Sequence, residues 1–290
     1  MTGLAAGLAL LAAMLFALAS AAQQRSAAAV PEQGGVELMR VLVRRPLWWA
    51  GTLSDVGGYA AQAAALAFSS LLLVQPLLVT TLLFALPLGA RYAGHRLRAA
   101  DWGWAVLLTG SLAVFVMTGD PTEGVDRASL EQWLPVAAVL GALLAGCLVG
   151  AAARRGTTRA VLLAVATGVA YGITAALTKG VVSLLDDGVL TILTSWETYA
   201  LAVAVAGGTL LQQSAFQAGD LGASLPAVTV GEPVVGVAIG VTVLGEQLRA
   251  GGAEWVLIGV LVVVLVVATV ALARSAARSA GIEPGRVPTR

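Results

Sequence analysis

The sequence contains few charged residues. Asp, Glu, Lys and Arg make up 11% of its 290 residues, whereas apolar residues make up 58%. A soluble domain carries about a quarter charged residues, because its surface must be covered by groups that water solvates. Here the charges fall in short clusters between long apolar runs. The composition therefore predicts an all-α polytopic membrane protein.

Three residue types that often carry chemistry occur once each. Cys147 lies in an apolar run, which excludes an intramolecular disulfide and argues against a thiolate metal site. His95 is the single histidine, so a metal site built from histidines is not expected, and Lys179 is the single lysine. The sequence also lacks a phosphate-binding loop, the order of a catalytic triad and a basic nucleic-acid patch. We expect no enzyme activity, no cofactor, no bound metal and no nucleic-acid partner.

Apolar runs separated by charged loops predict nine transmembrane helices. The first run resembles a signal peptide, but it lacks a basic beginning and has the length of about 20 residues that a spanning helix needs. We expect it to remain as a helix. The predicted helices cover residues 3–22, 47–68, 71–90, 102–118, 134–152, 160–184, 198–218, 221–244 and 255–273.

The basic residues are distributed unevenly about these helices. Nine crossings place the two termini on opposite sides, and 14 of the 17 Lys and Arg residues then fall on one side. The exceptions are Arg127, Lys179 and Arg249. Basic loops stay in the cytoplasm. The sequence therefore predicts a multi-pass plasma-membrane protein with its N-terminus outside and its C-terminus in the cytoplasm.

The two halves of the chain share an internal repeat. Gly58 and Gln62 match Gly208 and Gln212 at an offset of 150 residues. A chance likeness among Ala-, Leu- and Val-rich helices is the alternative. Because one helix links the two four-helix units, the second unit is expected to be inverted relative to the first. The further matches are Phe16 with Tyr171, Pro76 with Pro226, His95 with Glu246, and Trp104 with Trp255. The predicted units are residues 1–118, the acidic loop and linking helix 119–158, residues 159–275, and a basic tail 276–290, which we expect to be disordered.

Short motifs near the end of the second unit carry a family resemblance. The sequences EPVV at 232–235 and LGE at 244–246, with the GE-x-LR box that ends at Arg249, resemble the EamA-type drug/metabolite transporter superfamily. The sequences LWWAG at 47–51 and QPL at 75–77 are similar to the NIPA-type magnesium transporter branch. The resemblance implies nine helices and solute transport. The first unit departs from the pattern, because His95 stands where the second has Glu246.

Polar side chains on helix faces predict a solute pathway. Glu232 precedes Pro233 inside an apolar helix, and a carboxyl group at such a depth usually faces a cavity or a partner. Its uncharged, protonated form is favoured there, which suits proton exchange. Asp55 and Tyr59 share a helix face, as do Thr167 and Tyr171. The predicted pathway comprises Asp55, Tyr59, Gln62, Gln75, Tyr171, Thr174, Gln212, Gln213 and Glu232.

Each of these residues also has a structural interpretation. Asp55 could meet lipid headgroups, the threonines could bond to their own helix, and Glu232 could be a fixed polar anchor. Lys179 could reach the outer interface or pair with Asp186 or Asp187. Glu246 is expected to pair with Arg249 at a helix end. The predicted structural residues are Pro76, Pro226, Pro233, Gly236, Gly240, Glu246 and Arg249, with the two glycines at a tight helix crossing.

Three functions follow from these patterns. The leading hypothesis is a secondary transporter of a small metabolite or drug-like solute, with proton coupling through Glu232. The second is a divalent-cation transporter of the NIPA kind, disfavoured because Asp55 and Glu232 are the only carboxylates within the membrane and Mg²⁺ needs oxygen ligands. The third is a membrane scaffold that transports nothing. The expected partners are a small-molecule or ion substrate and the lipid bilayer, and a homodimer is left open.

Overall fold

The computed structural model describes residues 2–28, 41–93, 97–119, 121–122, 124–218 and 221–279. Each of the nine predicted helices has a counterpart within these ranges. The helices are α1 (Thr2–Ala28), α3 (Pro46–Ala67), α4 (Leu71–Leu78), α5 (Thr81–Ala93), α6 (Ala99–Gly119), α7 (Leu130–Ala152), α8 (Gly156–Val182), α9 (Val189–Thr194), α10 (Trp196–Ala218), α11 (Leu221–Thr242) and α12 (Gly252–Ser279). A 3₁₀ turn η1 (Leu185–Asp187) and two short strands, β1 (Pro121–Thr122) and β2 (Gln247–Leu248), complete the described elements.

Five of the described helices are long and apolar enough to cross a membrane. Their apolar stretches are Gly3–Ala22 in α1, Ala99–Gly119, Leu130–Ala152, Gly156–Asp187 and Glu254–Leu272. Shorter apolar stretches occupy Leu71–Ala85 and Ala227–Thr242. Large apolar side chains also point outward, as Val139, Val203 and Val256 do. Water solvates such an apolar surface poorly, whereas lipid accommodates it. The chain is therefore a helical membrane protein.

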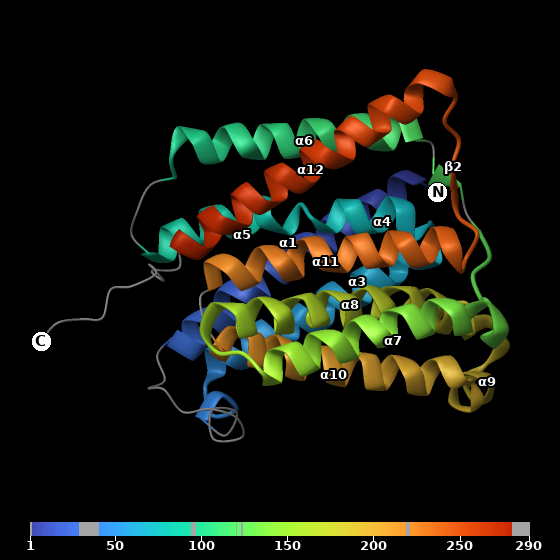
Figure 1. Ribbon diagram of the computed structural model, residues 1–290, viewed down its shortest axis with the longest axis horizontal. Coiled ribbons are helices and arrows are strands. Elements are labelled where there is room, and N and C mark those ends of the chain that lie inside the picture. Colours follow the sequence, from blue (N-terminus) through green and yellow to red (C-terminus); the bar gives the residue numbers. More distant parts are fainter. Residues whose placement is uncertain are drawn as a thin grey trace, which may run out of the picture.

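Helix α8 lies in the interior of the bundle. Within its apolar span 72% of the residues are buried, compared with 11% in α7. It packs against α7, α10 and α11, and it also contacts α3. In the other half of the chain α1 packs against α3, α4 and α5, while α6 pairs with α12 along one edge (Figure 1). Small side chains such as Ala164, Gly168 and Gly172 let neighbouring helices approach α8 closely.

The predicted helix 71–90 is divided into α4 and α5. Val79 and Thr80 separate the two, and the Thr80 and Thr81 hydroxyls donate to the carbonyls of Leu77 and Leu78, each at 2.6 Å. These hydroxyls take the place of main-chain donors, which permits the turn. The expectation of one continuous helix was therefore wrong at this position.

Other differences lie at the ends of elements. Helix α1 continues to Ala28 and α12 to Ser279, so each extends about one and a half turns beyond its predicted C-terminal end. The part of the predicted disordered tail up to Ser279 is therefore helical, and residues 280–290 lie outside the described part. Helix α9, the turn η1 and the β1–β2 pair were not predicted, because such short elements leave little periodic signal.

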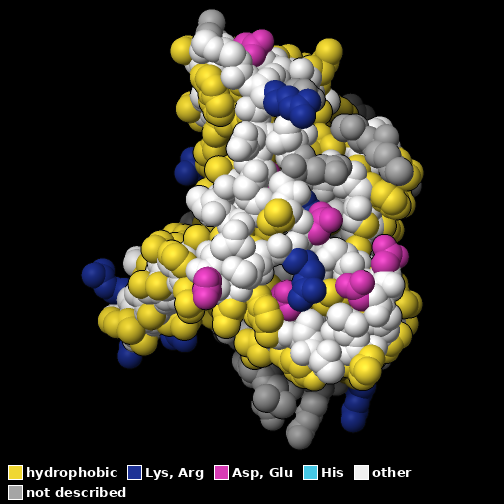
Figure 2. Space-filling model, turned by 90° about the vertical axis from the view of Figure 1, so that its right-hand side faces the viewer, with side chains coloured by type: hydrophobic (Ala, Val, Ile, Leu, Met, Phe, Trp, Pro, Cys, Tyr) yellow, Lys and Arg dark blue, Asp and Glu magenta, His cyan; other side chains and the backbone are white. Residues whose placement is uncertain are grey.

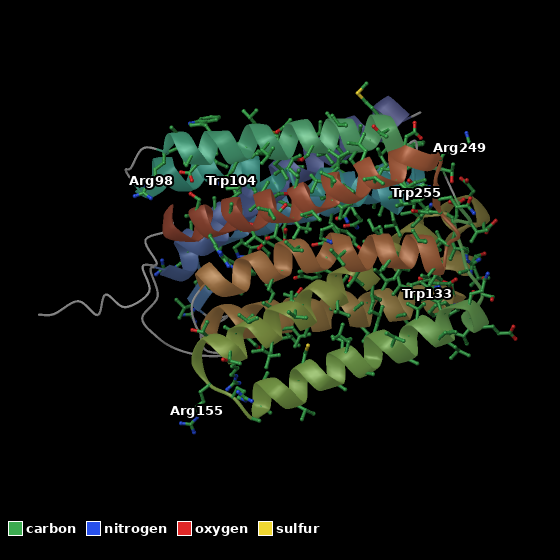
Figure 3. The ribbon with its side chains drawn as sticks, turned by 45° about the horizontal axis from the view of Figure 1, so that its top comes forward. Arg98, Trp104, Trp133, Arg155, Arg249 and Trp255 are labelled. Atoms are coloured by element: carbon green, nitrogen blue, oxygen red, sulfur yellow. The ribbon has the colours of Figure 1, made fainter. Side chains whose placement is uncertain are left out.

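The two ends of the bundle differ in charge. Arg98 and Arg155 lie at one end, and Arg249 lies at the other (Figure 3). Helix α1 begins, and α12 ends, at opposite ends of the bundle (Figure 1). Acidic side chains gather at the end that carries the strand pair (Figure 2). Its exposed acidic residues include Asp126, Asp186, Asp187 and Glu254. Arg98 and Arg155, which come from two of the predicted basic loops, therefore lie at the same end of the bundle.

Candidate functional site

Helix α11 carries Glu232 and runs unbroken through Pro233. Proline has no N–H group, so Pro233 cannot donate to the Thr229 carbonyl one turn earlier. The Glu232 side chain is partly exposed, and none of the hydrogen bonds among the described residues reaches its carboxylate. A partly exposed carboxyl group halfway along a packed helix is expected to face solute or water rather than lipid.

Glycines bring α8 against this part of α11. A Cβ atom on Gly168 would lie 2.9 Å from the Gly231 Cα atom, and one on Gly172 would lie 2.9 Å from the Gly236 nitrogen. Both distances are shorter than a real Cβ contact, so the backbones touch where any larger residue would separate them. The predicted crossing at Gly236 is confirmed. Its partners include α8, which sets the Tyr171 region beside Glu232.

Four of the predicted pathway residues make up a set that we call the polar cluster, in which three groups lie within electrostatic range of Glu232. The Glu232 carboxylate interacts electrostatically with Asp55, Tyr59 and Tyr171. Asp55 and Tyr59 come from α3, Tyr171 comes from α8 and Glu232 comes from α11. The cluster therefore joins helices from both halves of the chain. Asp55 is exposed, and the other three residues are partly exposed.

Hydrogen bonds fix the two tyrosines of the cluster. The Tyr59 hydroxyl bonds to the Thr178 hydroxyl, which connects α3 with α8. The Tyr171 hydroxyl donates to the Gln212 Oε1 atom at 3.0 Å, which connects α8 with α10. Gln212, another predicted pathway residue, thus contacts one member of the polar cluster. Partners on neighbouring helices therefore hold both phenol hydroxyls in place.

The remaining predicted pathway residues whose side chains are described are buried. Gln62 is buried in α3. Thr174 is buried and donates to the Ala170 carbonyl of its own helix at 2.9 Å, so its hydroxyl serves the helix instead of a solute. Gln75 is fully buried in α4. The side chains of Gln213 and Pro226 lie outside the described part of the structure.

A second polar site lies where α4 begins. Glu246 follows α11 and is fully buried. Its Oε1 and Oε2 atoms accept hydrogen bonds from the main-chain nitrogens of Leu71 at 2.9 Å and Leu72 at 3.0 Å. The first amides of a helix have no partner within the helix, and its N-terminus attracts negative charge. Glu246 therefore caps α4, together with the Ser70 hydroxyl, which accepts from Leu73.

Lys179 neutralises this carboxylate. Its Nζ atom lies 2.9 Å from the Glu246 Oε1 atom, and the side chains are 1% and 0% exposed. The same Nζ atom lies 3.8 Å from an oxygen of Asp126. The predictions for Lys179 were wrong, because it neither reaches the interface nor pairs with Asp186 or Asp187. Glu246 does have the predicted structural role, but it bonds to Lys179 and α4 instead of the expected Arg249.

Two loops are joined above this buried pair. Strands β1 and β2 pair antiparallel, with Pro121 opposite Leu248. The Val125 nitrogen donates to the Leu244 carbonyl at 2.8 Å. Gly124 packs so closely that an added Cβ atom would overlap the Leu244 carbonyl oxygen. The acidic loop is thereby fixed to the segment that contains Glu246.

A further ion pair borders the same end of α8. The Arg127 Nε and Nη2 atoms donate to the Glu197 Oε1 atom at 3.1 and 2.8 Å. Beside it, the Trp133 and Trp196 rings meet edge to face with centroids 6.1 Å apart. The Arg127–Glu197 ion pair connects the acidic loop to α10. The ion pair was not predicted, because Arg127 and Glu197 are 70 positions apart in the sequence.

The described residues contain no group of three or more His, Cys, Asp or Glu side chains that could hold a metal ion. The polar cluster offers the carboxyl groups of Asp55 and Glu232 and two phenol groups, and Gln212 adds an amide beside Tyr171. Such a set can exchange a proton and form hydrogen bonds with a solute.

Comparisons with known proteins place the chain beside one corynebacterial relative. No family model matches the chain, and no solved structure matches it significantly. The chain is 36% identical over 259 residues to the uncharacterized protein Cgl0250/cg0304 of Corynebacterium glutamicum. The match covers 86% of this chain and 90% of the relative. The chain therefore belongs to the same protein family as this corynebacterial protein.

Proposed function

We propose that the protein is a secondary transporter of the drug/metabolite superfamily, EamA-like, that moves a small metabolite or drug-like solute by alternating access. The observation that carries the proposal is the polar cluster of Asp55, Tyr59, Tyr171 and Glu232, to which both halves of the chain contribute. Transporters built from repeats bind their solute between the halves, near the middle of the membrane. In this proposal the nine helices all cross the plasma membrane.

Equivalent contacts in the two halves support the inverted repeat. A Cβ atom on Gly58 would lie 2.8 Å from the Phe16 ring, and one on Gly208 would lie 2.7 Å from the Tyr171 ring. These are the pairs that the sequence repeat matches with each other. In each half the first helix also packs against the second and third, α1 against α3 and α4, and α8 against α10 and α11.

The charge distribution supports the proposed orientation. Arg98 and Arg155 share one end of the bundle (Figure 3), which the positive-inside rule assigns to the cytoplasm. The N-terminus is then outside and the C-terminus inside. Glu232 lies in an apolar helix with no hydrogen-bond partner among the described residues, so it can take up and release a proton as the halves move.

The test is a current measurement on reconstituted full-length protein. Amino acids, nucleosides, cationic dyes and Mg²⁺ are added to proteoliposomes on a solid-supported membrane, with the wild type, Glu232→Gln and Glu254→Gln compared. Glu254 is an exposed carboxylate at the start of α12, so its variant is the matched control. We expect current with an organic solute in the wild type and in Glu254→Gln, and loss of it in Glu232→Gln.

Other results would favour the alternatives. Current with Mg²⁺ alone would replace the proposal with the divalent-cation transporter. Solute current that Glu232→Gln leaves unchanged would remove Glu232 from the pathway. The absence of current and of solute-induced thermal stabilisation for every compound would favour the scaffold.

A further inference from the structure

Gln75 is a buried amide without a partner. Its side chain is fully buried in α4, and among the described residues neither Nε2 nor Oε1 has a hydrogen-bond partner. Nearly all buried polar groups in folded proteins are paired, so an unpaired one needs an explanation. Leaving a polar group unpaired costs more free energy inside a membrane, because no water is available there as a hydrogen-bond partner. A leucine or methionine would fill the same space without that cost.

Pro76 and Gly236 border this buried amide. The next residue, Pro76, lacks an N–H group and cannot donate to the Leu72 carbonyl on the preceding turn. On the facing helix α11, Gly236 makes room for the amide. A Cβ atom at Gly236 would lie 2.9 Å from the Gln75 Cγ atom and 3.3 Å from its Nε2 atom. Gly236 is one helical turn beyond Glu232, so the amide lies beside the part of α11 that carries the carboxyl group of the polar cluster.

From this arrangement we infer that Gln75 is a solute-binding residue that recognises a neutral group with an adjacent donor and acceptor, such as a primary carboxamide. The inference rests on the proposed transport function and deepens it by naming the class of solute. An amide donates through Nε2 and accepts through Oε1, so a second carboxamide satisfies both atoms at once. A carboxylate cannot donate to Oε1, and it would add negative charge near Glu232 and Asp55.

The test compares three ligands that differ at a single group: nicotinamide, nicotinate and 3-methylpyridine. Thermal unfolding of the detergent-solubilised full-length protein is followed by tryptophan fluorescence as each ligand is titrated. We expect nicotinamide to raise Tm in a concentration-dependent manner and the other two to leave it unchanged, because a ligand that binds the folded state stabilises it. In Gln75→Met the nicotinamide shift should be lost, while Tm without ligand stays equal to or above that of the wild type.

Thr80→Val is the matched control. Thr80 is also buried between α4 and α5, but its hydroxyl is already bonded to the Leu77 carbonyl, so this variant should keep the nicotinamide shift. The inference is overturned if nicotinamide does not stabilise the wild type, if it stabilises Gln75→Met equally, or if Gln75→Met alone lowers Tm. The last result would make Gln75 a structural residue.

The current assay separates this inference from the proposed function. Solute current that survives in Gln75→Met would leave transport standing and remove Gln75 from the site. Nicotinamide protection that depends on Gln75, without current from any compound, would support the binding residue and remove transport.

Discussion

Glu246 and Glu232 are two carboxylates of the same segment with opposite surroundings. Glu246 is fully buried and bonds to Leu71, Leu72 and Lys179. Glu232 is partly exposed and has electrostatic neighbours but no hydrogen-bond partner among the described residues. The same type of side chain thus holds helices together in one place and makes no hydrogen bond to the described residues in the other.

Removing the Glu246 carboxylate should have the largest effect. Glu246→Ala leaves Lys179 as a buried, unpaired charge and uncaps α4, so we expect a loss of about 3–5 kcal/mol in unfolding free energy. The measurement is denaturation in detergent, followed by tryptophan fluorescence, with Glu254→Ala as control. If both variants unfold alike, the buried pair does not stabilise the fold.

The pairing between Lys179 and Glu246 can be separated from the effect of each residue alone. In a double-mutant cycle with Lys179→Met and Glu246→Gln, we expect a coupling of about 1–3 kcal/mol, since the two atoms are in contact. Values near zero would mean that the cap on α4, rather than the ion pair, accounts for the role of Glu246. Arg249→Gln combined with Glu246→Gln is the comparison cycle, and it should give additive effects.

The crossing of α8 and α11 positions the Glu232 cluster. Gly172→Ala would place a Cβ atom 2.6 Å from that of Val235, so we expect a loss of about 1–3 kcal/mol and weaker solute current. Gly141→Ala is the control, because nothing lies within 4 Å of its added Cβ atom. There the better helix propensity of alanine should give a gain of up to about 1 kcal/mol. A neutral Gly172→Ala would contradict the close crossing.

Glu232→Gln should have the smallest effect on stability. A glutamine keeps the shape of the side chain and has no charge to desolvate, so we expect a change within about 1 kcal/mol, toward greater stability. Current should nevertheless be lost. A large destabilisation would show that Glu232 is a structural anchor like Glu246, and the contrast between the two carboxylates would disappear.

The sequence predicts what depends on local pattern. Apolar runs located the helices, and helix periodicity placed Asp55 and Tyr59 on one face of α3, within electrostatic range of Glu232. Gly236 at the helix crossing was also predictable, because a glycine in an apolar helix usually marks close packing.

Contacts between distant segments could not be predicted. The sequence offered Arg249, three residues away, as the partner of Glu246, whereas the structure supplies Lys179, 67 residues earlier. Nothing in the spacing of charges indicates that α4 begins beside Glu246. The break at Thr80 was missed for a related reason, since a threonine inside an apolar run bonds either to its own helix or at a turn, and sequence pattern does not distinguish the two.

The cap on α4 has a consequence for how the chain is assembled. Leu71 is synthesised 175 residues before Glu246, the residue that accepts its amide hydrogen. The start of α4 therefore enters the membrane without its final partner and obtains it only when the last quarter of the chain arrives. Strand β1 likewise cannot pair until β2 has been synthesised. The acidic end of the bundle is thus completed late in synthesis, and a chain that stops before Glu246 leaves the start of α4 without this cap.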